Sequence, residues 1–192
     1  MSLMQSMPSP RITAMIRLDH MHVLATFHRY HVDSPRWRKT AIVNVACAAL
    51  EIHAQLEEEI FYPALRAAGV AEVALDKSVP EHDAMRATIA SLRSTEPGTN
   101  EYDVLFMTLM REVMHHVADE ETILLPQAEK TMNAELRALG SRMTRRRLAL
   151  LAQRPGEIAV NTAGTFPLMT FAIGAFALLG AARLGRRRRT AR

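Results

Sequence analysis

The chain has 192 residues and one cysteine, Cys47, which excludes an intramolecular disulfide and a site built from several cysteines. Hydrophobic residues make up 48% of the sequence and charged residues 23%, and this balance excludes wholesale disorder. The net charge of +4 combines two unlike parts, because residues 1–136 carry 12 Lys or Arg against 19 Asp or Glu, whereas residues 137–192 carry 12 Arg against one acid. We therefore expect an acidic domain with a basic tail and no nucleic-acid partner.

The first half of the acidic domain is predicted to contain two helices. Residues 1–10 are expected to be an N-terminal leader that precedes the folded domain. The first helix begins after the leader and ends before Pro35, because proline disfavours helix in the residue before it. The second helix is predicted over residues 38–68, with Gly69 as its C-terminal cap.

The second half repeats this arrangement. A third helix is predicted to begin near Pro80, which suits a first helical turn, and to end before Pro97. A fourth runs over residues 100–130 at least. No segment alternates apolar and polar residues long enough to form a sheet. The sequence therefore predicts an all-α fold, an up-down antiparallel four-helix bundle over residues 11–133.

The second and fourth predicted helices share one pattern. Residues 53–63 and 116–126 both read His, three residues, Glu-Glu, one residue, Ile, two residues, Pro, at a constant offset of 63. Residues four apart lie on one helix face, so each His and the first Glu after it can bind a common metal ion. The closing proline of each copy is expected to kink the helix beyond the site.

The first and third predicted helices carry a matching pair of histidines. His20 follows Asp19, and His82 follows Glu81, 62 residues later. The bundle is thus a helix pair used twice, which brings four imidazoles and two carboxylates to one level of the core. The candidate metal ligands are His20, His53, Glu57, His82, His116 and Glu120. This donor set suits two irons, although manganese and zinc fit it as well.

Other polar residues of these helices have simpler interpretations. An isolated histidine in a helix is more often solvated than a ligand, and we apply this to His22, His28, His31 and His115. The run of three glutamates at residues 57–59 is similarly typical of a solvated face. Tyr62 and Tyr102 are possible redox neighbours of a metal, but packing is the favoured role.

These motifs resemble those of the hemerythrin-like, HHE cation-binding proteins. The resemblance covers roughly residues 11–132 and rests on the dipeptides Asp19-His20 and Glu81-His82 and on the two His-x-x-x-Glu-Glu patterns. It implies an up-down four-helix bundle around a non-haem di-iron centre. It also implies that the four histidines of the candidate set are iron ligands and that Glu57 and Glu120 bridge the two irons.

The sequence departs from the oxygen-carrying hemerythrins at one position. Those proteins have a further histidine four residues after the one on the third helix, where this chain has Arg86. They also place the last carboxylate five residues after its histidine, which leaves Glu121 with His116, or Glu120 with His115, as less favoured alternatives. The set is more similar to the bacterial HHE branch, and simple oxygen carriage is not the expected role.

The C-terminal part of the chain predicts a membrane segment. Residues 134–160 are expected to form an Arg-rich helix or linker, residues 161–185 an apolar membrane segment and residues 186–192 a basic tail. Residues 163–182 contain no charge, and 20 helical residues span about 30 Å, the thickness of a bilayer core. The alternative is an apolar helix that docks on the bundle or lies in the membrane interface.

Three functions follow from these features. The leading hypothesis is a membrane-associated di-iron protein, its bundle facing the cytoplasm, that binds O₂, NO or peroxide for sensing, scavenging or delivery. Without the membrane segment the protein would be cytoplasmic. The second hypothesis is an enzyme, a di-iron oxidase, peroxidase or nitric oxide-handling protein. The third is a membrane-associated interaction protein without metal.

Overall fold

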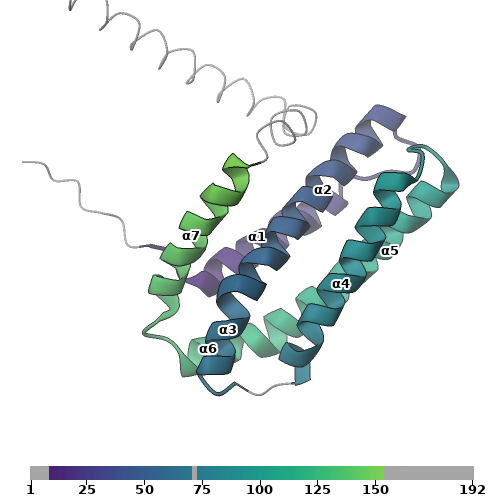
Figure 1. Cartoon of the computed structure of the whole chain (residues 1–192). Coiled ribbons are helices and arrows are strands. Elements are labelled where there is room, and N and C mark those ends of the chain that lie inside the picture. Colours follow the sequence, from purple (N-terminus) through teal and green to yellow (C-terminus); the bar gives the residue numbers. More distant parts are fainter. Residues whose placement is uncertain (1–8, 71–72, 154–192) are drawn as a thin grey trace, which may run out of the picture.

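The computed structural model describes residues 9–70 and 73–153, and every regular element in this part of the chain is helical (Figure 1). The elements in chain order are α1 (Ile12–Phe27), α2 (Arg36–Leu56), the π-helical turn η1 (Glu57–Phe61), α3 (Tyr62–Ala67), α4 (Val73–Ser94), α5 (Asn100–Asp119), the π-helical turn η2 (Glu120–Leu124), α6 (Leu125–Thr131) and α7 (Leu136–Ala152). The prediction of an all-α fold is confirmed for the described residues.

Four helical rods make up the bundle. They are α1, the continuous run α2–η1–α3, then α4, and the continuous run α5–η2–α6. Consecutive rods pair, α1 with α2 and α4 with α5, and the second rod of each pair is the longer one. The chain therefore folds as two helix pairs, as the internal repeat predicts (Figure 1).

Two helix ends differ from the sequence prediction. The first helix ends at Phe27 rather than near Pro35, because the chain turns there and Tyr30 packs back into the core. The third helix begins at Val73, so Pro80 lies inside it rather than in its first turn. Pro80 is exposed, and the helix continues through it on the solvent side. Gly69 has a φ of 77°, as a C-terminal cap requires.

The buried apolar residues form two clusters at opposite ends of the bundle. One lies at the end where η1, α3, η2 and α6 meet α7, and it contains Leu56, Phe61, Leu65 and Leu124 among others. The second lies at the other end of the bundle, among α1, α2, α4 and α5. It adjoins a buried ion pair in which Lys39 Nζ lies 2.8 Å from both carboxylate oxygens of Asp103. The level between the two clusters is where buried histidines and glutamates are found.

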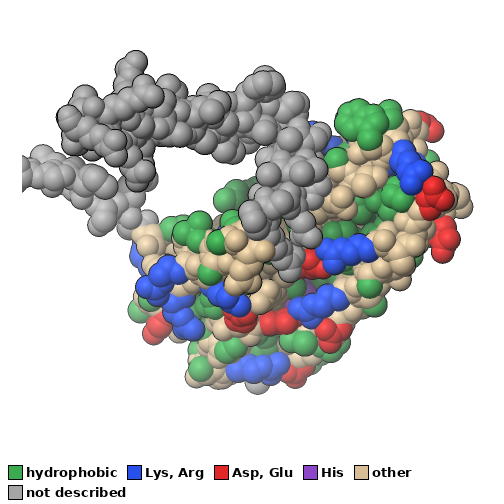
Figure 2. All heavy atoms as spheres, turned by 45° about the horizontal axis from the view of Figure 1, so that its top comes forward, with side chains coloured by type: hydrophobic (Ala, Val, Ile, Leu, Met, Phe, Trp, Pro, Cys, Tyr) green, Lys and Arg blue, Asp and Glu red, His purple; other side chains and the backbone are tan. Residues whose placement is uncertain are grey.

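The Arg-rich stretch of the tail begins with a helix that belongs to the folded part. α7 packs against α1 and α2, with Leu139, Met143 and Leu150 buried. A Cβ at Gly140 would lie 2.0 Å from the carbonyl oxygen of Pro10, so only glycine allows this approach. On the face shown in Figure 2, basic and acidic side chains alternate and histidine is almost hidden.

No helix within the described residues is both long and apolar enough to span a bilayer. The apolar stretch at residues 161–185 and the basic tail at residues 186–192 lie outside the described residues. The same holds for most of the leader, and these three assignments stay predictions.

Candidate metal centre

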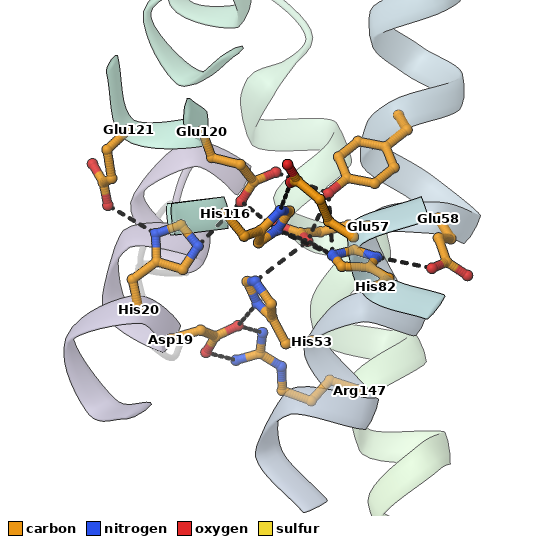
Figure 3. Close-up of polar contacts among 12 residues, drawn as sticks. Asp19, His20, His53, Glu57, Glu58, His82, His116, Glu120, Glu121 and Arg147 are labelled. Carbon is orange, nitrogen blue, oxygen red and sulfur yellow. Dashed lines mark hydrogen bonds and ion pairs between the residues drawn. The ribbon is translucent and has the colours of Figure 1, made fainter. Parts of the chain in front are cut away.

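Six buried side chains from all four rods meet at the level between the two apolar clusters. α1 contributes His20, α4 contributes His82, and each longer rod contributes a histidine and a glutamate four residues later. We call the six the histidine–glutamate cluster: His20, His53, Glu57, His82, His116 and Glu120. All six point toward one another in Figure 3. The structure thus brings together every residue of the candidate set predicted from the sequence.

The cluster divides into two overlapping groups with metal-ligand spacing. One group consists of His20, His53, Glu57 and Glu120, and the other of Glu57, His82 and His116. Within each group the candidate ligand atoms lie within 4.8 Å of one another. Because Glu57 belongs to both groups, its carboxylate is within reach of histidines from both helix pairs. This arrangement can hold two metal ions joined by a carboxylate.

Both glutamates stand at the start of a π-helical turn. Pro63 and Pro126 have no N–H to continue the α-helical ladder. The residue before each proline instead donates its backbone N–H five residues back, from Tyr62 to Glu57 and from Leu125 to Glu120. The prolines were expected to produce a kink, and the structure has a widened turn in its place. Such turns are frequent at functional sites.

The π turn changes which side chains share a face. Five residues complete about one such turn, so residues at positions i and i+5 project to the same side. In the first pair of rods this aims Tyr62 at the cluster together with Glu57, and its hydroxyl lies 3.1 Å from Glu57 Oε2. The same hydroxyl lies 3.0 Å from Glu120 Oε1 and 3.4 Å from His82 Nε2. Leu125 occupies the equivalent place in the second pair.

Each cluster histidine is held by a carboxylate from the neighbouring rod. The Nδ1 atoms lie 2.8–3.3 Å from one carboxylate each, and the Nε2 atoms face the centre (Figure 3). The pairs are His20 with Glu121, His53 with Asp19, His82 with Glu58 and His116 with Glu81. We call Asp19, Glu58, Glu81 and Glu121 the outer carboxylates. An Nδ1–H donated to a carboxylate fixes the tautomer that leaves Nε2 free to bind a metal.

Three of the outer carboxylates also pair with an arginine. Arg147 of α7 lies 2.5 Å from Asp19, and Arg86 lies 2.6 Å from Glu58. Arg17 lies 3.2 Å from Glu121. These guanidinium groups balance the negative charge around the cluster and hold the carboxylates in place. Arg86 stands where the oxygen carriers have a further histidine, and here its side chain serves Glu58 instead.

The buried atoms of the cluster fit a metal rather than a metal-free core. Glu57 is fully buried, and its Oε1 and the Nε2 of His53 have no hydrogen-bond partner. A buried polar atom without a partner costs about 1–3 kcal/mol, and a buried charge costs more. Both atoms lie in the first of the two metal-ligand groups. A cation there would satisfy both atoms at once.

The protonation of the metal-free cluster is uneven. Burial and the charge of Glu120 raise the pKa of Glu57 well above its ordinary value. Burial alone would do the same to Glu120, but the hydrogen bond from His20 and the nearby histidines lower its pKa to about 2. Burial also opposes charge on His20, yet Glu120, Glu57 and Glu121 raise its pKa to about 9. Without a metal, His20 therefore supplies the positive charge beside Glu120.

A small cavity adjoins the four cluster histidines on the side away from Tyr62. Its volume is about 20 Å³, which is enough for about one water-sized molecule. Beyond the histidines its walls are mainly apolar, formed by Val23, Leu50, Met85, Ile89, Val113 and Val117. A diatomic molecule or peroxide is the size of ligand that such a space admits next to a metal.

The structure separates the less favoured candidates from the cluster. His115 is exposed, and so are His22, His28 and His31. Glu121 is half-buried and contacts His20 from outside as an outer carboxylate. The sequence analysis favoured packing for Tyr62, a solvated face for Glu58 and a less favoured ligand role for Glu121, and it did not find that the outer carboxylates act as a group. The signal was present, since each outer carboxylate is the chain neighbour of a cluster residue.

Two comparisons relate this chain to known proteins. A family model described as the hemerythrin HHE cation binding domain matches residues 11–128. Among solved structures, the hemerythrin HHE cation binding domain-containing protein of Mycobacterium kansasii, a homologue of Rv2633c, superposes with a TM-score of 0.64. It is 19% identical in sequence, and the match covers 84% of this chain and 96% of that one. Among curated proteins, none has a matching sequence.

Proposed function

The chain belongs to the hemerythrin HHE cation-binding family, and we propose that it is a non-haem di-iron protein that binds O₂, NO or peroxide for sensing, scavenging or delivery. The observation that carries the proposal is the pair of metal-ligand groups that share Glu57. Two overlapping groups with one common carboxylate suit two ions rather than one.

The residues divide between the two ions by helix pair. His20 and His53 would hold one iron and His82 and His116 the other, and Glu57 and Glu120 would supply the carboxylates of the centre. Bound iron supplies redox chemistry and open positions for a small ligand. The chain supplies the rest. The outer carboxylates orient the imidazoles, and the apolar walls of the cavity keep bulk water away from the ligand position.

Tyr62 adds a hydrogen-bond donor at the centre of the site. Burial and the charges of Glu57 and Glu120 raise its pKa well above the ordinary value, so the hydroxyl keeps its proton. It donates that proton to Glu57 Oε2 or to Glu120 Oε1, both within hydrogen-bond distance. Tyr62 therefore lies between the two carboxylates and can hydrogen-bond to either of them.

The same hydroxyl favours one alternative, an oxidase, peroxidase or nitric oxide-handling enzyme. Turnover of these ligands consumes protons, and Tyr62 carries one at the cluster. A Tyr62→Phe variant separates the two functions when ligand binding and turnover are measured on iron-loaded protein. For a binding protein, ligand affinity and the rate of ligand dissociation change little. For an enzyme, turnover falls by about 10²–10⁴-fold, the usual contribution of a proton donor.

The experiment that tests the di-iron proposal is metal analysis with an optical spectrum. Protein is purified without air, iron, manganese and zinc are counted, and the spectrum is recorded before and after exposure to O₂. We expect about two irons per chain, set by the two ligand groups, and a new absorption band when O₂ enters. Protein that contains none of these metals and takes up none on reconstitution would contradict the proposal and favour the metal-free interaction protein.

We further propose that residues 161–185 attach the protein to a membrane, with the bundle on the cytoplasmic side. The support is the uncharged run at residues 163–182 together with exposed Arg142 and Arg145 on α7, which suit anionic headgroups. Fractionation of the full chain against a version ending at Gln153 tests it. We expect only the full chain to sediment with membranes, and equal distribution of the two would refute the attachment.

A further inference from the structure

Glu81 differs from the other three outer carboxylates. Asp19, Glu58 and Glu121 each pair with a guanidinium group, from Arg147, Arg86 and Arg17 respectively. Within the described residues, the ion-pair partner of Glu81 is the cluster histidine His116 alone, 2.9 Å away. Its side chain is 21% exposed, close to the 20% of Asp19, so Glu81 differs from Asp19 in its partners and not in its exposure.

Two further ligand-type side chains approach Glu81 from α5. His115 and Asp119 are four residues apart and therefore share one face of that helix. Donor atoms of Glu81, His115 and Asp119 lie within 4.8 Å of one another. This group lies outside the histidine–glutamate cluster, and its histidine is exposed.

The first helix pair shows why this group has no counterpart there. The residues equivalent to His115 and Asp119, 63 positions earlier, are Ile52 and Leu56. Both are buried in the apolar cluster that includes α7 residues, and α7 also brings Arg147 to Asp19. In the second pair the described chain places no such helix over Glu81. The guanidinium group that α7 supplies in one pair therefore has no counterpart at Glu81, where the nearby cation is Lys77, which pairs with Asp119.

We propose that Glu81, His115 and Asp119 bind one divalent cation on the outside of the bundle. The cation provides at Glu81 the positive charge that arginines provide at the other outer carboxylates. One imidazole and two carboxylates suit zinc, manganese or ferrous iron, with solvent completing the coordination. The site is separate from the cluster, and its existence does not depend on which metal the cluster holds.

Lys77 is the competitor for this site. Its Nζ lies 2.7 Å from Asp119 Oδ2, on the surface of α4. An exposed ion pair of this kind is weak, because solvent screens it and two side chains must be immobilised. A divalent cation bound by three donors displaces the ammonium group from Asp119. The affinity of the site for the cation therefore depends on competition between Lys77 and the ion for Asp119.

The site also reaches the cluster through one residue. One oxygen of Glu81 accepts the hydrogen bond from His116 Nδ1, and its carboxylate would also bind the outer cation. An ion there holds Glu81 in place, as Arg147 holds Asp19 for His53. By linkage, occupancy of the cluster and of the outer site strengthen each other.

The test uses Zn²⁺ as the probe and the full chain loaded with iron. Zinc binding is measured by equilibrium dialysis, and iron is counted before and after. His115→Ala is compared with His28→Ala, since both remove an exposed histidine and only one belongs to the site. We expect the wild-type chain and His28→Ala to bind one zinc that His115→Ala binds about tenfold or more weakly, as lost ligand contacts usually cost.

Lys77→Ala supplies a test in the opposite direction. Removing the competing ammonium group should tighten zinc binding several-fold, which mere loss of a surface contact would not do. Equal zinc binding by wild type and His115→Ala overturns the proposal, and so does zinc uptake matched by an equal loss of iron. The difference between wild type and His115→Ala is expected in protein without iron as well, so this result is distinguishable from failure of the di-iron proposal.

Discussion

The two helix pairs carry the same cluster residues at the same spacing, yet they differ in what surrounds them. In the first pair, α7 covers the outside and Arg147 fixes Asp19. In the second pair, the described chain places no helix outside Glu81, and the ion-pair partner of Glu81 is His116. The repeat therefore determines where a metal centre can form, and the departures from the repeat determine how each half of the centre is supported.

The interior of the site is unequal in the same way. The first pair supplies Tyr62 after its π turn, whereas the second supplies Leu125 at the equivalent position. The Tyr62 hydroxyl also reaches Glu120 of the second pair, so it can donate its one hydrogen bond to either glutamate. A symmetric set of histidines and glutamates thus has asymmetric surroundings, with the Tyr62 hydroxyl on one side and the mainly apolar cavity on the other.

The largest effect is expected when equivalent histidines of the cluster are removed. His53→Ala and His116→Ala are equivalent in the repeat, and each should strip iron from its own pair. The double variant should lose both irons and about 3–5 kcal/mol of stability, because buried Glu57 and Glu120 would lose the metal and two of the histidines that balance their charge. Iron content and thermal melting measure this.

His28→Ala is the matched control for these variants, since His28 is exposed on the surface. It should leave iron content and melting unchanged. Full iron content and unchanged melting in the double variant would rule out the proposed ligands. Loss of iron in one single variant but not in the other would show that the two pairs do not share the centre equally.

The outer carboxylates should sharpen the comparison between the pairs. Asp19→Asn and Glu81→Gln each weaken the hold on one cluster histidine, and iron affinity should fall by about 10–100-fold in either. Only Asp19→Asn should also lower the melting temperature further, because Arg147 loses its partner. Chelator competition and melting measure the two effects. Asp76→Asn, which breaks the exposed pair with Arg66, should change neither.

The packing of α7 against the bundle can be tested at Gly140. A methyl group there meets the Pro10 carbonyl, so Gly140→Ala should cost about 1–3 kcal/mol as an overpacked contact. The loss of stability should be confined to the first helix pair, because α7 contacts α1 and α2. Denaturant unfolding gives the cost, with Ala149→Ser on the exposed side of α7 as control. Equal stability of the two variants would mean that α7 is not tightly packed against residue 10.

The smallest effect is on the pH dependence of the metal-free protein. The equivalent histidines His20 and His82 shift in opposite directions, since carboxylates raise the pKa of His20 to about 9 from 6.5 and burial lowers that of His82. Stability from His20 is complete below pH 6.5 and is lost as the pH rises through 9. His82 disfavours the folded state when the pH falls below 6.5, because only the unfolded chain then takes up a proton.

Melting of metal-free protein should therefore be highest near pH 6.5 and fall toward pH 9. Metal-loaded protein should not show this fall in melting temperature toward pH 9, since the metal replaces the proton on His20. His20→Gln should weaken the fall in the metal-free protein. A fall of the same size in His20→Gln would assign it to another group.

The sequence predicted the helical class and the meeting of the six cluster residues, because both follow from local spacing. His53 with Glu57 and His116 with Glu120 share a face in any helix, and the 63-residue offset required a second copy. Their role as ligands remains a prediction that metal analysis must test. Helix limits set by proline were less predictable. Pro80 lies within α4 on its exposed side, where a missing N–H is tolerated.

What sequence reasoning could not find depended on contacts between rods. The inward position of Tyr62 requires the π turn, and an α-helical projection would have aimed it away from Glu57. The pairing of Asp19 with Arg147 joins positions 128 residues apart, and no periodicity links them. Similarly, the Arg-rich stretch of α7 indicated a helix but not the surface on which Leu139 and Met143 pack.

The hydrogen bonds from the outer carboxylates have a consequence for assembly. Each cluster histidine is oriented by the rod before it, and the last link closes the circle from η2 back to His20 on α1. No three rods complete the circle, and no single helix pair orients all of its own histidines. A partly folded chain therefore offers poorly aligned imidazoles to a passing ion. Tight metal binding is therefore expected only after all four rods have assembled.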